Sequence, residues 1–382
     1  MFKFKRLLIA ISAALAFIFI FSFNQVGVQA DMPAPHLSAS AAADLESFCK
    51  SLWVHEGAQH KNLVIFPVTL RAMRDSSHYT TLDEALESGK VKITEVGSGS
   101  VPTLHMEILS TEPLFFMAGE VVTGAKQDRI LTHDLLFRGF KGGVDLPVYC
   151  VEQGRWTSMS DRFEAGKILG STALRQTAVM KEGQHTAWAE VQQKNADMDA
   201  STATGTFQAT YDNEKYRKAE SEFMDKLRDI PSMHGGQVCG VVIAIDGKVV
   251  SADLFANPSL FRKLWPKVLK AAITDSVTAG GSATSDNTAA RELLGAVLKA
   301  KIAAQDNPSQ GQEFTLNSDN VQGSFIRSSK GVAHLALFTG AIKRAAPSED
   351  EEPQLQIQRQ NQDNRLRDRS SRPNTQIKRE PS

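Results

Sequence analysis

Two apolar, β-branched runs joined by a pair of turn residues set the first limit on how this chain can fold. Val241–Ile245 and Val249–Phe255 flank the dipeptide Asp246-Gly247. Asp-Gly suits the type I′ turn, whose twist matches that of two antiparallel strands. The sequence therefore predicts a β-hairpin over Val238–Phe255, and with it a sheet that contains antiparallel pairs.

Short runs of similar composition recur along the chain, separated by Gly, Pro or Ser. Leu63–Phe66 is expected to form a buried strand that ends at Pro67, because proline has no N–H to contribute to a sheet. A last hairpin is expected over Val321–Phe338, with its turn near Lys330. Further strands are expected at Val91–Val96, Leu104–Leu109, Leu114–Val122, Ile130–Phe137 and Val144–Val151. Consecutive short strands of this kind indicate antiparallel pairing.

Amphipathic helices are expected between these strands. Thr81 and Glu84 form a capping box at the start of a short helix that Gly89 ends. Asn257 is the N-cap of a longer helix, which Pro266 should kink. Helices are also expected at Thr172–Asn195 and Asn213–Ile230. The fold class is therefore α+β, with antiparallel strands and hairpins packed with amphipathic helices. The residues alone leave open one interlocked domain or two.

The first thirty residues are typical of an export signal. Three basic residues precede an apolar run, Leu7–Phe23, and small residues up to Ala30 offer a cleavage site before Asp31. We expect a signal peptide over 1–30 and a periplasmic or secreted location after export. The alternative is an uncleaved membrane tether, since the 17-residue run is at the short end of a bilayer span.

The opposite end has a different composition. Residues 344–382 contain no aromatic side chain and six apolar residues. Such a segment buries too little apolar surface to offset the entropy lost on ordering, so we expect a disordered charged tail. Residues 31–49, after the signal, are expected to be an N-terminal linker.

Charge and cysteine content exclude several classes of protein. The 43 Lys and Arg residues balance the 43 Asp and Glu residues, and removal of the signal leaves a net charge of −3. A protein that binds nucleic acid normally carries a basic excess, so no nucleic acid is expected as a partner of this chain. Three cysteines cannot build a disulfide scaffold, and pairing of Cys150 with Cys239 is left open. His55 and His60 are five residues apart, which does not fit the zinc-protease helix motif, and no metal site is predicted.

Two stretches place charged residues between apolar runs, at Met117–Arg129 and Val148–Trp156. Strand alternation puts Glu152 on the same face as Val148 and Cys150, where a buried carboxylate would need a cationic partner. Together the stretches predict a site with two candidate acid/base residues and four ligand-binding residues: Glu120 and Glu152, and Lys126, Gln127, Arg129 and Arg155. A structural ion-pair network between two hairpins is the alternative interpretation.

These motifs resemble a known bacterial family, named for its association with ADP-ribosylglycohydrolases and rhodanese-type phosphatases. The resemblance rests on Gly119-Glu120, Gly124-Ala125-Lys126-Gln127, Cys150 to Trp156, and Leu264-Trp265-Pro266-Lys267, and it covers about 50–338. Asp128 departs from the asparagine that the family pattern has after Lys-Gln. The resemblance implies one large domain, placed here at 50–343, and a role near ADP-ribose or nucleotide processing.

The function expected from these observations is that of an exported protein that binds or processes a small anionic ligand such as an ADP-ribose-like nucleotide. Lys126, Arg129 and Arg155 would hold the anion, and Glu120 or Glu152 would act as acid or base if the protein is an enzyme. The alternative is a non-enzymatic cell-envelope binding or scaffold module whose polar cluster is structural. The residues name no cofactor.

Overall fold

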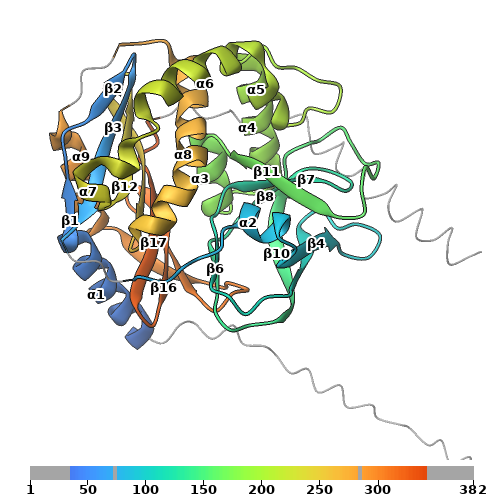
Figure 1. Cartoon of the computed structure of the whole chain (residues 1–382), viewed down its shortest axis with the longest axis horizontal. Coiled ribbons are helices and arrows are strands. Elements are labelled where there is room, and N and C mark those ends of the chain that lie inside the picture. Colours follow the sequence, from blue (N-terminus) through green and yellow to red (C-terminus); the bar gives the residue numbers. More distant parts are fainter. Residues whose placement is uncertain (1–34, 72–74, 283–285, 342–382) are drawn as a thin grey trace, which may run out of the picture.

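Strand pairing divides the described chain, residues 35–71, 75–282 and 286–341 of a computed structural model, into two main antiparallel sheets and a small third one. Figure 1 shows the larger sheet on one side of the molecule and the smaller on the other, with helix α8 (Pro258–Ala279) between them. The signal predicted at 1–30 and the tail predicted at 344–382 lie outside the described residues.

The larger sheet has nine strands. Its order is β1 (Leu52–Val54), β3 (Leu63–Leu70), β12 (Val238–Ile245), β13 (Lys248–Phe255), β17 (Gly331–Phe338), β16 (Gln322–Ser328), β15 (Gln312–Asn317) and β14 (Lys301–Gln305), and β2 (Ala58–His60) also pairs with β3. The hairpin predicted at 238–255 is confirmed as β12–β13, with Asp246 and Gly247 at φ 51° and 75°, as a type I′ turn requires. The hairpin predicted at 321–338 is confirmed as β16–β17.

The smaller sheet has six strands and carries most of the predicted site. Its order is β11 (Phe163–Leu169), β7 (Glu120–Gly124), β8 (Arg129–Leu131), β10 (Gly142–Cys150), β5 (Thr103–Ile108) and β4 (Val91–Glu95). The third sheet pairs β6 (Leu114–Phe116) with β9 (Leu135–Phe137). Helix α2 (Leu82–Glu87) packs beside β4, β6 and β11, and its predicted capping box is present, with Thr81 N–H donating to Glu84 Oε2 at 2.9 Å.

The prediction that the strand beginning at Leu63 ends at Pro67 is wrong, because this strand, β3, continues to Leu70. Along that edge β2 pairs with residues 63–65 and β1 with residues 68–70, so Pro67 lies between the two partners. Its carbonyl accepts from His55 N–H at 2.9 Å, and its missing N–H faces the same gap. The proline therefore removes no bond from either ladder.

Helices cover both faces of the nine-stranded sheet. On the inner face α8 packs against β12, together with α3 (Thr172–Val179), α6 (Glu214–Leu227) and the short α7 (Met233–Gly236). Helix α4 (Gln184–Asp197) packs against β10 of the smaller sheet, and α5 (Gln208–Asp212) packs against α4 and α6. On the outer face lie α1 (Pro35–Ser51) and α9 (Asn287–Val297). The linker predicted at 31–49 is therefore wrong from residue 35 onward, because Ala41, Leu45 and Phe48 recur at helical spacing and are buried in that outer core.

One helix prediction also needs correction. The helix predicted at Thr172–Asn195 is two helices, α3 and α4, separated where Lys181 and Gly183 adopt φ of 56° and 102°. Helix α8 continues through Pro266, although a proline in a helix interior removes one hydrogen bond. The α+β class is confirmed, since the sheets pair antiparallel and the strands and helices occur in separate runs along the chain. None of the described helices combines the length and apolar character needed to cross a membrane.

Candidate functional site

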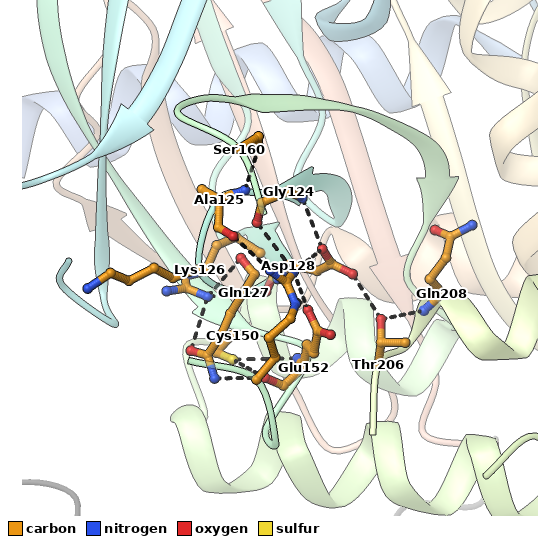
Figure 2. Close-up of polar contacts among 12 residues, drawn as sticks. Gly124, Ala125, Lys126, Gln127, Asp128, Cys150, Glu152, Ser160, Thr206 and Gln208 are labelled. Atoms are coloured by element: carbon orange, nitrogen blue, oxygen red, sulfur yellow. Dashed lines mark hydrogen bonds and ion pairs between the residues drawn. The ribbon is translucent and has the colours of Figure 1, made fainter. Parts of the chain in front are cut away.

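The tight turn between β7 and β8 brings the two predicted stretches together. Strand β8 pairs with β10 so that Arg129 lies opposite Cys150. Glu152 and Arg155 follow β10 directly and therefore fold back over the turn, where Ala125 adopts a φ of 40°. Figure 2 shows side chains from both stretches converging on Asp128 and Glu152.

An ion-pair network forms the centre of this cluster. Glu152 Oε2 lies 2.5 Å from Arg155 Nη2 and accepts from the Asp128 N–H at 3.2 Å. The same guanidinium lies 3.2 Å from Asp128 Oδ1 and donates to the Ala125 carbonyl at 2.7 Å. Burial alone would lower the pKa of the Arg155 guanidinium. The hydrogen bond and charge of Glu152, together with the charge of Asp128, outweigh the effect of burial, so the pKa is raised. Glu152 is 4% exposed and the Arg155 side chain 10%, so little of this ion pair is open to solvent.

Gln127 and Arg129 hold the backbone of the cluster. The Gln127 amide donates to the Glu152 carbonyl at 2.8 Å, and Arg129 Nη1 donates to the Gln127 carbonyl at 3.0 Å. Arg129 is fully buried, with Nη2 3.9 Å from Glu95 Oε1. Its Nε and Nη2 make no hydrogen bond, although both are enclosed by the described residues. These two side chains tie the turn to the segment after β10.

Asp128, where the sequence departs from the family pattern, belongs to the same network. Its Oδ2 accepts from Thr206 Oγ1 at 2.9 Å, and Glu152 forms a β-bridge with Thr206. Burial, and then the charge of Glu152, raise the pKa of the Asp128 carboxyl. Residue types could not reveal the role of Thr206, because it lies 78 residues further along the chain than Asp128. Glu95, beside Arg129, was also missed.

Glu120 lies apart from the other predicted residues. It starts β7, four residues before Gly124, and a strand advances about 3.4 Å per residue, so roughly 14 Å separates the two strand ends. Its carboxylate pairs with Lys267 of α8 and accepts from the Met117 N–H at 2.7 Å. Burial raises the pKa of Glu120, whereas these two donors favour its ionised form. Lys267 also lies 2.7 Å from Asp83 Oδ1.

Lys126 is the predicted cation that reaches the surface. Its Nζ donates to the Ser98 carbonyl and lies 4.9 Å from the ring centroid of Trp156, which is 39% exposed. Within residues 35–71, 75–282 and 286–341, no ion pair involves Lys126. The loop at Gly99 covers the lysine, since a Cβ there would lie 3.0 Å from Nζ. The cluster thus has a buried ion-pair centre and an exposed rim formed by Lys126 and Trp156.

A second buried charge network, which the sequence did not reveal, joins the two sheets. Arg175 Nη1 and Nη2 lie 2.9 and 2.7 Å from the two oxygens of Asp253. His334 Nδ1 lies 2.6 Å from Asp134 Oδ2, and its Nε2 lies 3.4 Å from Asp253 Oδ1. Burial would lower the pKa of His334, but the two carboxylates raise it to about 9. Each of these side chains is at most 3% exposed, so the network contributes to folding rather than to contact with a ligand.

The geometry limits the chemistry available at the predicted site. Both candidate acid/base carboxylates, Glu120 and Glu152, are buried and engaged with a cation and a backbone N–H. In the described part of the chain, no group of three or more His, Cys, Asp or Glu residues is placed to hold a metal ion. The three cysteines are buried free thiols.

Comparison with known proteins assigns the domain. Residues 51–338 match the family model of the ARG and Rhodanese-Phosphatase-superfamily-associated Protein domain. No curated protein and no solved structure matches the chain.

Proposed function

Because this chain belongs to the family of the ARG and Rhodanese-Phosphatase-superfamily-associated Protein domain, we propose that its folded part binds a small anionic ligand of the ADP-ribose-like nucleotide class. The binding element is the exposed rim, Lys126 and Trp156. The observation that carries the proposal is a lysine that has no carboxylate partner among the described residues and lies 4.9 Å from the centroid of a tryptophan ring that is 39% exposed. A lysine ammonium binds phosphate as a point charge, and an aromatic ring stacks on a base.

The buried ion pairs support binding rather than catalysis. A general acid or base must come within hydrogen-bond reach of the substrate, directly or through one water. Glu152 instead pairs with Arg155 and accepts from the Asp128 N–H. Glu120 pairs with Lys267 and accepts from the Met117 N–H. In this proposal the cluster fixes the turn that carries Lys126, and the carboxylates have an architectural role.

The same pairing favours a second candidate function, a cell-envelope scaffold module that binds no small ligand. The two candidates share a structural ion-pair cluster and differ in the role of the rim. A scaffold module gives no saturable nucleotide binding, whereas the binding module does. A titration with ADP-ribose therefore separates them.

The binding titration uses single substitutions with matched controls. Lys126→Ala and Trp156→Ala should each weaken ADP-ribose binding about tenfold or more, since loss of base stacking costs about 1–3 kcal/mol. Lys248→Ala and Trp53→Ala remove another exposed lysine and another exposed tryptophan, and should leave the dissociation constant unchanged. Isothermal titration calorimetry measures each constant. Absence of saturable binding to ADP-ribose, AMP and ribose 5-phosphate would reject the proposal.

Export is proposed separately, from the residues at 1–30. Expression of the full chain in a bacterial host, followed by cell fractionation and intact mass, tests it. A product that begins at Asp31 in the periplasm or medium supports a cleaved signal. An intact chain in the membrane fraction supports a tether, and an intact chain in the cytoplasm contradicts export.

A further inference from the structure

A groove of about 490 Å³ lies beside the six-stranded sheet, away from the buried cluster. It is bounded by the end of α2 and by β4 and β11, the two outermost strands of that sheet (Figure 1). Its volume falls within the range of roughly 300–1,000 Å³ that small-molecule sites occupy. Neither Lys126 nor Trp156 lines it, so it is distinct from the rim proposed above.

The floor of the groove is apolar. Val91 and Phe163 are buried beneath it, and Leu86 lines its side. Leu109, just after β5, is 48% exposed and is one of the few large apolar side chains that the described surface presents to water. A ligand that covered Leu109 would remove apolar surface from water, which favours binding.

The walls of the groove carry more positive than negative charge. Lys92, Arg162 and Lys167 line it together with the carboxylates of Glu87 and Glu164. Lys167 Nζ lies 2.6 Å from Glu87 Oε1, whereas Lys92 and Arg162 form no ion pair with any described residue. Two of the three cations that line the groove therefore have no ion-pair partner among the described residues.

The position of Lys167 in the groove depends on a bulge in β11. The register with β7 shifts between Ala165 and Leu169, and Lys167 adopts a φ of 56°. Positive φ is uncommon for a residue with a Cβ, and bulges of this kind re-aim a side chain. Gly166 permits the bulge, because a Cβ there would lie 2.5 Å from the Val121 carbonyl oxygen.

We infer that this groove binds a small amphipathic anion, a molecule with one phosphate, sulfonate or carboxylate group on an apolar body. The apolar body lies on Leu109, Phe163 and Val91, and the anionic group lies between Lys92, Arg162 and Lys167. Glu87 competes with the ligand for Lys167, since both are anions that reach the same ammonium group.

The test uses 8-anilinonaphthalene-1-sulfonate, a fluorescent amphipathic anion, with the intact chain. We expect saturable binding with one site per chain, and weaker binding of N-phenyl-1-naphthylamine, which has the same ring system without the sulfonate. Lys92→Gln and Lys167→Gln should each weaken sulfonate binding at least fivefold. Glu87→Gln should tighten it two- to fivefold, because it releases Lys167.

Matched controls keep the result interpretable. Lys248→Gln removes an exposed lysine outside the groove and should leave the dissociation constant unchanged, and circular dichroism checks that every variant is folded. A constant that is the same in all lysine variants would overturn the inference, as would non-saturable binding or equal affinity for the uncharged probe.

Discussion

Glu120→Gln tests whether the candidate acid/base residues are architectural. Glu120 is fully buried, and its two oxygens accept from Lys267 and from the Met117 N–H. A glutamine is the same size, but it is uncharged and has one acceptor oxygen for the two donors. Removal of one partner from a buried ion pair costs about 3–5 kcal/mol. Lys267 keeps Asp83 at 2.7 Å, whose side chain is 20% exposed, so we expect the lower end, about 3 kcal/mol.

Thermal unfolding followed by circular dichroism or calorimetry measures this loss. A change of 1 kcal/mol shifts Tm by about 2–4 °C in chains of 150–250 residues, and the shift is smaller in larger chains, so we expect a decrease of about 6 °C. Glu292→Gln, an exposed carboxylate on α9, is the control and should change stability by less than about 0.5 kcal/mol.

The double variant Glu120→Gln with Lys267→Met sharpens the result. It removes both charges, so its destabilisation should be smaller than the sum of the two single effects. If Glu120→Gln unfolds within 1 °C of the unmodified chain but no longer binds or turns over a nucleotide, then Glu120 acts on the ligand and the architectural interpretation is wrong.

Two further outcomes are expected from the second buried network. The pKa of His334 in the folded protein, about 9, lies above its unfolded value near 6.5, so its contribution is fully present below pH 6.5 and is lost as pH rises through 9. Urea unfolding should show a loss on the order of 3 kcal/mol over this range, and a slope that is the same in His334→Gln would contradict the assignment. Gly119→Ala places a Cβ 2.6 Å from Arg175 Cγ at a φ of 92°, and should cost about 2 kcal/mol in the same assay; unchanged stability would show that Arg175 can move aside.

Local features of the fold could be predicted from the sequence because they depend on neighbouring residues. Asp246-Gly247 fixes its turn through backbone conformations that these two residues tolerate, and Thr81 and Glu84, three residues apart, form the capping box of α2. Pro67 misled the prediction, because its effect depends on which strand edges it faces, and those edges come from residues 52–54 and 58–60. The linker prediction failed because the apolar stripe of α1 needs an outer sheet face to cover, which no local pattern reveals.

The candidate site was predictable only in part, for the same reason. Gln127, Arg129, Glu152 and Arg155 come together because β8 pairs with β10; the sequence predicted a strand at each place but did not identify the two as partners. Glu120 does not join them, because its partner Lys267 is 147 residues away on α8. The exposure of Lys126 and the burial of the other cations follow from packing, and residue types alone could not distinguish them.

The dissociation constant of ADP-ribose for folded Glu152→Gln, measured beside Lys126→Ala at a temperature well below both melting transitions, tests the central claim most directly. If the ion-pair cluster is architectural and the rim binds the ligand, Glu152→Gln should bind within about threefold of the unmodified chain, and Lys126→Ala at least about tenfold more weakly. A folded Glu152→Gln protein that no longer binds, beside a Lys126→Ala protein that still does, would contradict it.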